Sequence, residues 1–222
     1  TIVFWRAADH KAKQGIPTVI SDPRRTGSVQ ALESIDPENS HHVQTINGDI
    51  SVLNAIAHCI LTEHEDIVEY DFLKENTVNW EDYIKMCREE YSPEQAQGIT
   101  GVEPQLIRDI ADDWANATRK GKRKGKGGVI SFWGIGYNQH IHGQHNVISV
   151  INLHALTGNL GRPGAGPFSM TGQPNAMGER LMGGLTGRLP FNQGIAGKNG
   201  PNLKGIETIS KAWNCSPDKL HN

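Results

Sequence analysis

The sequence lacks several features that would assign its class directly. Its three cysteines, Cys59, Cys87 and Cys215, are odd in number and far apart, which argues against a disulfide framework and offers no spacing typical of zinc or iron–sulfur sites. The formal net charge of −2 provides no field for binding nucleic acid or an acidic membrane surface. No apolar run approaches the roughly 18 residues of a membrane span, and no signal segment is present. The cysteine pattern favours a reducing compartment.

The two ends of the chain also lack the features of natural termini. The first residue is Thr1 rather than Met, and it leads directly into the apolar run Ile2-Val3-Phe4-Trp5. The chain ends in polar residues at Asn222 without finishing a domain. A length of 222 residues suits one large or two small domains. We expect the chain to be a piece of a longer protein.

Glycine is abundant, with 25 residues, and it is concentrated in residues 157–180, TGNLGRPGAGPFSMTGQPNAMGER. Glycine permits tight turns and close backbone approach, and the three prolines of this stretch oppose a helix. The stretch also carries many hydrogen-bonding side chains, unlike a flexible linker. Loops longer than about 15 residues are usually functional or disordered. The pattern predicts a binding loop, in which the polar candidates are Asn159, Arg162, Thr171, Gln173, Asn175 and Arg180.

Short apolar runs alternate with helical patterns in the rest of the chain. Strands are predicted at 18–20, 43–46 and 128–134, the last as a buried strand. Helices are predicted at 2–13, from residue 50, between 70 and 91, from Ser92 to Gly98, after Pro104, at 147–156 and at 206–213. Cys59 lies off the apolar stripe of its helix, and a structural thiol is expected. The fold class is α/β, a doubly wound, Rossmann-like parallel sheet that is incomplete, over residues 1–166, followed by a glycine-rich extension over 167–222.

Polar residues follow each predicted strand. Asp22 follows the first strand and Asp49 the second. The third strand ends at Gly134 and Gly136, and Tyr137, Asn138 and Gln139 follow as polar residues. In open parallel sheets, ligands bind outside the carboxyl ends of strands, and an acidic residue there commonly accepts hydrogen bonds from a ribose or a base. The alternative for Asp22 is a turn or a helix cap.

Two further patterns have bland interpretations. His140, His142 and His145 lack a neighbouring carboxylate cluster, so we assign no metal to them. The basic run at residues 119–126 lacks the interleaved aromatics of a nucleic-acid site. It is predicted to be a solvated surface loop, with a docking site for an acidic electron donor as the alternative.

Three ordered motifs resemble a known family. The run LTGNLGRPGAGPFSMTGQPNAMGERLMGG, preceded by GIGYNQHIHGQHN and by the segment DPRRT, resembles the interior of the large subunit of the molybdopterin oxidoreductases. That group holds nitrate reductases, formate dehydrogenases and dimethyl sulfoxide reductase. The TGQPNAMG segment and the arginine after it are most similar to assimilatory and periplasmic nitrate reductases. The resemblance covers residues from about 2 to about 211.

This resemblance implies a cofactor and its binding residues. The family's cofactor is molybdenum bis(molybdopterin guanine dinucleotide), and residues 1–166 would form part of its binding domain, with 167–222 belonging to the adjacent domain. The resemblance places Asp49 on guanine, although the surrounding Ile46-Asn47-Gly48 departs from the family's Pro-Gly-Thr. The other implied cofactor-binding residues are Asp22, Arg24, Thr26, Gly134, Gly136, Tyr137, Gln139, Thr171, Gly172, Gln173 and Asn175.

The resemblance also implies residues near the reacting centre and a substrate. Arg180, Gln173 and Met177 are the implied catalytic residues, and no residue of this chain is expected to ligate the metal. Formate dehydrogenases carry Arg-Gly-Gln where this chain has Thr171-Gly172-Gln173, which favours nitrate over formate. Glu179 stands where nitrate reductases commonly have glycine, and it could pair with Arg180.

The chain has no match to the family's four-cysteine motif for a [4Fe-4S] cluster, to its molybdenum-binding cysteine or to its carboxyl-terminal domain. We therefore expect the 222 residues to be inactive alone and to act with the remaining domains of a parent catalytic subunit, a small oxyanion and an unidentified electron donor. The expected compartment is the cytoplasm, with the periplasm as the alternative. The rival interpretations are a formate dehydrogenase-like enzyme, a non-catalytic guanine-nucleotide-binding α/β module and an interaction module built on the basic run.

Overall fold

The computed structural model describes residues 2–46, 48–182, 188–189, 193–194, 196–197, 200–201 and 203–220. The chain divides into two compact units, Thr1–Ser169 and Met170–Asn222. The predicted boundary lay after residue 166. Each unit is described by itself.

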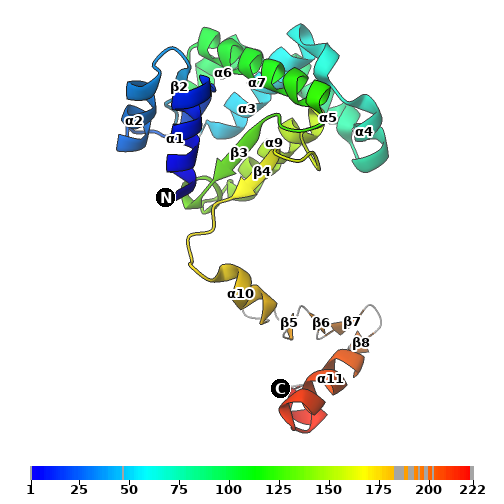
Figure 1. Cartoon of the computed structure of the whole chain (residues 1–222). Coiled ribbons are helices and arrows are strands. Elements are labelled where there is room, and N and C mark those ends of the chain that lie inside the picture. The colour runs from blue at the N-terminus through cyan, green and yellow to red at the C-terminus, as the bar shows by residue number, and fades with distance from the viewer. Residues whose placement is uncertain are drawn as a thin grey trace. The chain divides into compact units, whose positions relative to one another are not determined.

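The first unit alternates helices with short strands (Figure 1). In chain order its elements are α1 (Ile2–Gln14), β1 (Thr18–Ser21), α2 (Gly27–Ile35), β2 (Ser40–Val43), α3 (Asp49–Glu63), the 3-10 turn η1 (Glu65–Ile67), α4 (Tyr70–Asn76), α5 (Trp80–Glu90), α6 (Pro93–Thr100), α7 (Pro104–Lys124), β3 (Ile130–Trp133), α8 (Ile135–Asn138), α9 (Gly143–Leu156) and β4 (Gly166–Ser169).

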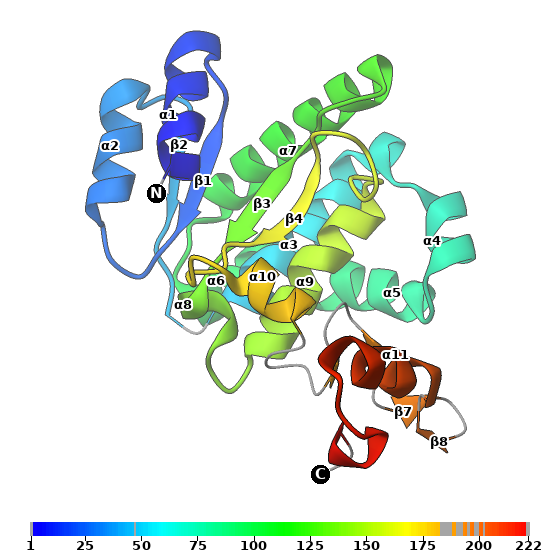
Figure 2. The same cartoon turned by 60° about the horizontal axis from the view of Figure 1, so that its bottom comes forward.

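The strands of this unit form two parallel pairs. Thr18 of β1 aligns with Ser40 of β2, and Ile130 of β3 aligns with Gly166 of β4. Figure 2 shows β3 and β4 side by side, with α9 packed next to them. The predicted α/β class with parallel strands is confirmed. In the part of the chain that is described, no strand joins the two pairs, so they do not form one continuous doubly wound sheet.

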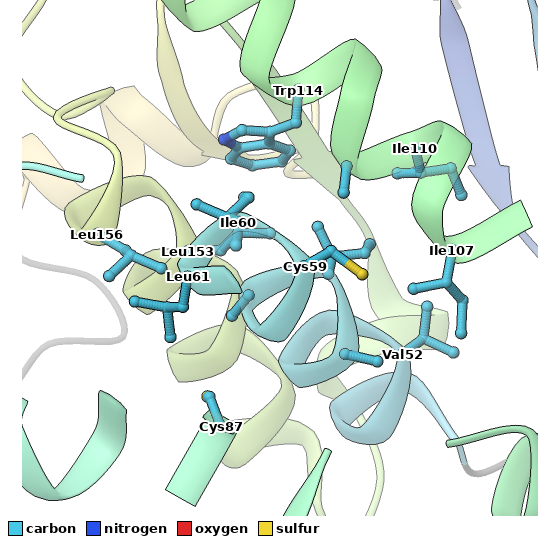
Figure 3. Close-up of a cluster of buried hydrophobic side chains, with 14 of the residues drawn as sticks. Val52, Cys59, Ile60, Leu61, Cys87, Ile107, Ile110, Trp114, Leu153 and Leu156 are labelled. Atoms are coloured by element: carbon cyan, nitrogen blue, oxygen red, sulfur yellow. The ribbon is translucent and has the colours of Figure 1, made fainter. Parts of the chain in front are cut away.

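The core is built around α3, which contacts α5, α6, α7 and α9. Ile60 and Leu61 of α3 are buried against helices on several sides (Figure 3), and burying each such side chain contributes about 1.5–3 kcal/mol. Cys59 is also fully buried although it lies off the apolar stripe, because α3 is covered on more than one face. Burial raises the pKa of the Cys59 and Cys87 thiols to about 12. Both are structural thiols that stay protonated.

The basic run is helical for most of its length. Helix α7 continues to Lys124 and ends at Gly125, whose φ of 64° is the left-handed conformation that glycine favours. Arg119 donates to both carboxylate oxygens of Asp66 at 2.6 and 2.7 Å, and Lys122 donates to the Ile67 carbonyl at 2.9 Å. The predicted surface loop is therefore wrong over this helix. Two of its basic residues fasten α7 to η1.

Two other predicted boundaries and one predicted burial differ from the structure. The second strand, predicted at 43–46, lies at Ser40–Val43, where its backbone pairs with β1 despite two histidines. Helix α6 passes through Gly98 and ends at Gly101 in the left-handed conformation. Strand β3 was predicted to be buried, but Ile130 and Phe132 are 47% and 50% exposed. They lie on a face of the β3–β4 pair that the described elements do not cover.

The second unit contains short elements. They are α10 (Ala176–Leu181), an antiparallel pair β5 (Arg188–Leu189) and β6 (Gln193–Gly194), a second antiparallel pair β7 (Ala196–Gly197) and β8 (Gly200–Pro201), α11 (Leu203–Trp213) and η3 (Pro217–Leu220). The predicted terminal helix is confirmed as α11, which buries Ile206 and Ile209. Of residues 191–202, the structure describes only 193–194, 196–197 and 200–201. Among the described helices, none is long and apolar enough to cross a membrane.

Candidate functional site

The segment after β3 offers open backbone. We call residues 134–143, which include α8, the Gly134 turn. A Cβ built on Gly134 or Gly136 would meet no heavy atom within 4 Å, and the Gln139 side chain is exposed. Backbone with free space above it lets a planar ligand approach closely. The predicted residues Gly134, Gly136 and Gln139 therefore lie together on an accessible turn.

Another glycine closes this turn. A Cβ on Gly143 would lie 2.0 Å from the Asn138 carbonyl oxygen, which no other residue could tolerate without a backbone shift. The Gly143 amide donates to the His140 carbonyl at 2.9 Å. The chain can thus fold back tightly, and α9 begins directly against α8. This return places the first turns of α9 beneath the Gly134 turn.

Asn146 holds the Gly134 turn from below. It is buried, with 2% of its surface exposed, and its Nδ2 contacts the Tyr137 carbonyl oxygen at 3.0 Å and His140 Nε2 at 2.9 Å. Sequence reasoning missed this residue. Its position within a largely apolar helix was the available signal. An asparagine buried in such a helix requires hydrogen-bond partners for its amide.

Asp49 lies in the first turn of α3 and faces the same region. Ser21, at the end of β1, contacts Asp49 Oδ1 through its hydroxyl at 3.4 Å. Burial raises the pKa of Asp49, while the Ser21 hydrogen bond and the nearby His140 ring oppose that rise. Burial also raises the pKa of Tyr137, and the Asp49 carboxylate adds to the effect. We call Ser21, Asp49, Tyr137, His140 and Asn146 the Asp49 cluster. Ser21 ends β1, Asp49 begins α3, Tyr137 and His140 belong to the Gly134 turn, and Asn146 lies in the first turn of α9.

The Asp22 segment has a local role. Asp22 Oδ1 accepts a hydrogen bond from the Arg24 amide at 2.8 Å, a contact typical of a turn, which was the alternative for this residue. Thr26 precedes α2 in an extended conformation without a side-chain cap hydrogen bond. Arg24 is exposed. The binding role of these three residues stays a prediction.

The predicted site residues of the second unit surround the start of α10. Thr171, Gly172, Gln173 and Asn175 are exposed, and Met177 is 72% exposed. A Cβ on Gly178 would lie 2.4 Å from Asn175 Oδ1, so this glycine leaves room for the asparagine side chain over the helix. The Arg180 side chain lies outside the described residues. Thr171, Gly172, Gln173, Asn175 and Met177 all belong to the second unit.

The first half of the predicted binding loop is structural. We call residues 157–166 the Gly158 turn. Asn159 is fully buried, and its Nδ2 donates to Thr118 Oγ1 at 2.8 Å and Thr157 Oγ1 at 2.9 Å. Its Oδ1 accepts a hydrogen bond from the Val129 amide at 3.4 Å. The predicted continuous loop is also interrupted by β4. These contacts tie α7, α9 and the entry to β3 together.

Arg162 belongs to the same arrangement. It donates to Asn159 Oδ1 at 3.3 Å, so it is turned toward the protein rather than presented to a ligand. As for metals, the described residues contain no group of three or more His, Cys, Asp or Glu side chains that could hold an ion.

Comparison with known proteins finds several relatives. The chain is 32% identical over 221 residues to a nitrate reductase of Synechocystis sp., 30% identical over 207 residues to F420-dependent formate dehydrogenase 1 subunit alpha of Methanococcus maripaludis, and 33% identical over 202 residues to formate dehydrogenase H of Escherichia coli. These matches cover 99%, 93% and 90% of this chain but 28%, 27% and 25% of the respective relatives. The chain thus spans about a quarter of their length.

No family model matches the chain. Among solved structures, acetylene hydratase from Pelobacter acetylenicus aligns with a TM-score of 0.41 and 20% identity, over 51% of this chain and 14% of that protein.

Proposed function

Because the chain is homologous to one segment of the molybdopterin oxidoreductases, we propose that it forms part of the cofactor groove and substrate funnel of a molybdenum-dependent nitrate reductase. The whole enzyme would reduce nitrate to nitrite with two electrons. Its cofactor would be molybdenum bis(molybdopterin guanine dinucleotide), and a [4Fe-4S] cluster would be bound by residues outside this chain. The 222 residues alone would not be active.

The residues of the Asp49 cluster fit the guanine end of such a cofactor. A carboxylate can accept hydrogen bonds from the N–H groups of a guanine. Asp49 is a partly buried carboxylate at the start of α3, in contact with Ser21 at the end of β1. Gly134 and Gly136 leave open space above the backbone beside it, where a flat group can lie. This juxtaposition of Asp49 with the open Gly134 turn is the observation that carries the proposal.

The substrate assignment has two supports. The match to a nitrate reductase covers almost the whole chain, and Thr171-Gly172-Gln173 lacks the arginine that the formate-type triplet carries. Arg180 would attract the anion and stabilise charge as an oxygen atom leaves nitrate. Glu179 beside it would weaken that attraction. A formate dehydrogenase-like activity is the second candidate, because two formate dehydrogenases match over at least 90% of the chain.

The uncovered face of β3 and β4 supports a larger parent. Ile130, Phe132 and Phe168 are 47%, 50% and 46% exposed on this face, and the two phenylalanine rings lie 5.9 Å apart. Parallel sheets are covered on both faces in folded proteins. We propose that another domain of the parent covers this face. The parent would act in the cytoplasm or, alternatively, in the periplasm with an electron donor of its own.

The experiment is to express the complete parent and measure its molybdenum content and its viologen-driven nitrate and formate activities. Arg180→Ala should lower kcat/KM for nitrate by about 10²- to 10³-fold, because a charge near the reacting anion is lost. Arg123→Ala, an exposed arginine of α7, is the matched control and should leave activity unchanged.

Three results would change the assignment. Formate oxidation without nitrate reduction would favour the second candidate. Equal activity of the Arg180→Ala variant and the wild type would remove the role of Arg180. A parent that contains no molybdenum but binds guanine nucleotides would favour a non-catalytic nucleotide-binding module built on the Asp49 cluster.

A further inference from the structure

Each parallel strand pair of the first unit has one edge that is poorly suited to a further strand. The Gly166 amide of β4 donates to the Val129 carbonyl at 2.9 Å, toward β3. Successive residues of a strand direct their backbone groups to opposite sides, so Pro167 faces the other edge of β4, and proline has no amide hydrogen. On the edge of β2 that faces away from β1, the Ser40 amide already donates to the Pro37 carbonyl at 3.3 Å. We call these the outer edges, and the free edges of β1 and β3 the inner edges.

The inner edge of β1 is open. The amides of Thr18 and Asp22 donate to carbonyl oxygens on or next to β2 at 2.9 and 3.1 Å. Val19 and Ser21 therefore direct their backbone N–H and C=O groups to the inner edge. The described residues provide no strand that pairs with β1 on that side.

The inner edge of β3 is open in the same way. Because the Val129 carbonyl accepts from β4, the backbone groups of Ile130 and Phe132 point to the inner edge, where the part of the chain that is described again offers no partner strand. Backbone groups buried without partners cost free energy, and open strand edges bind other strands. The two inner edges are therefore the places where a strand can add.

Helix α1 indicates which strand adds to β1. A helix that joins two parallel strands crosses over with a right-handed sense, and β1, α2 and β2 form one such unit. Helix α1 leads into β1 as α2 leads into β2, and it lies beside α2 (Figures 1 and 2). Two right-handed crossovers on one face advance the sheet in one direction. The strand that leads into α1 therefore belongs next to β1, on its inner edge.

The second strand pair is wound on the opposite face. Ile20 of β1 lines a small cavity with Leu32 of α2, whereas Val43 of β2, which points to the other face, is buried in the core around α3. Helix α9 contacts α3, and its His154 contacts Ser131 of β3 at 2.8 Å. The crossover from β3 to β4 thus lies on the α3 side, and this pair advances in the opposite direction from β1 and β2.

We infer that one strand of the parent, the strand that leads into α1, lies between β1 and β3 and runs parallel to both. The order across the sheet is then β2, β1, the parent strand, β3 and β4, as in a doubly wound sheet. The parent strand supplies the backbone partners of Val19, Ser21, Ile130 and Phe132. Residues that follow it would lie between Ser21 and the Gly134 turn, where the strand order reverses and doubly wound sheets bind ligands.

The first test is amide hydrogen exchange in the complete wild-type parent, resolved to single residues by mass spectrometry with electron-transfer fragmentation. The inner-edge amides should exchange at least about 100-fold more slowly than in an unfolded peptide. They should also exchange within about tenfold of the Ile20 and Ser131 amides, which pair with β2 and β4 in either case. Faster exchange at either inner edge would overturn the inference.

The second test identifies the strand. Val19→Cys, at a position that is 44% exposed, is combined in the parent with single cysteines scanned through the segment immediately before Thr1. Disulfides, detected by peptide mass spectrometry after oxidation, should form at alternate positions of the scan, because side chains alternate along a strand. Ser169→Cys on β4 is the control. It would lie two strand spacings, about 9–10 Å, from the parent strand and should form none.

Slow exchange at the inner edges without these disulfides would show that a different strand fills the position, and it would overturn the assignment to α1. The inference rests on the larger parent of the proposed function, but not on the parent's substrate or metal. Neither test measures molybdenum or nitrate reduction. A failure here can therefore be distinguished from a failure of the proposed function.

Discussion

The two glycine turns of the first unit have similar glycine content and different surroundings. In the Gly158 turn, a Cβ on Gly158 would lie 2.6 Å from Glu69 Cγ, and Asn159 is fully buried. In the Gly134 turn, Gly134 and Gly136 face open space, and Gln139 is exposed. Glycine content therefore does not distinguish a turn that packs against protein from a turn that can receive a ligand. The space above Gly158, compared with the space above Gly134 and Gly136, does.

The largest expected effect is a loss of stability from a substitution in the Gly158 turn. Asn159→Leu keeps the approximate size of the side chain but leaves the Thr118 hydroxyl and the Val129 amide without their partner. We expect the free energy of unfolding, measured with urea, to fall by about 3–4 kcal/mol, since each buried polar group left unpaired costs about 1–3 kcal/mol.

Asn138→Leu, at an exposed position of the Gly134 turn, is the matched control and should change stability by less than about 0.5 kcal/mol. Equal stability of the two variants would show that the difference between the turns is not energetic.

The second expected effect is a dependence of stability on pH, which arises from His154 beside the Gly158 turn. Its ring is fully buried, contacts Ser131 Oγ at 2.8 Å and packs against Trp114. Burial lowers the pKa of His154 to about 4, from an ordinary value of 6.5. The unfolded chain therefore binds more protons between these values, and stability falls as pH falls below 6.5 toward 4.

We expect a loss of about 2 kcal/mol in the free energy of unfolding between pH 8 and pH 5, measured by urea titrations at several pH values. His154→Gln should remove most of this slope. A variant with the wild-type slope would assign the pH dependence to another group.

The smallest expected effect compares the two turns directly. Gly158 has a φ of 63° and a close neighbour in Glu69, so Gly158→Ala should lower stability by about 1–2 kcal/mol. Gly136 lies in α8 with nothing within 4 Å of a Cβ. Gly136→Ala should leave thermal stability unchanged but weaken GMP binding, because a methyl group would occupy the open space. Equal destabilisation of both variants would contradict the distinction between the turns.

Local patterns predicted much of the fold. The apolar spacing after residue 50 predicts α3, and the dipeptide Ser92-Pro93 predicts the start of α6, where Ser92 and Gln95 form a capping box. The acidic residues after the first two strands led to Asp49, since strand ends converge in parallel sheets. These features depend on residues close together in sequence.

The features that were missed depend on distant contacts. Asn159 was predicted to face a ligand, but Thr118, far away in sequence, provides its buried partner. The full burial of Cys59 does not follow from the apolar stripe, because a single helix pattern does not reveal how many neighbours surround α3. The role of Asn146 depends on the tight return of the chain at Gly143, which brings its amide into contact with Tyr137 and His140.

Helix α9 has a consequence for how a ligand would be sensed. Asn146 lies in its first turn, and His154 lies in its last, so one rigid rod about 20 Å long joins the Asp49 cluster to the buried contacts near Thr157. Occupancy at His140 would restrain the start of this rod. Slower hydrogen exchange would then extend to the backbone amides of 153–156, at the end remote from the ligand.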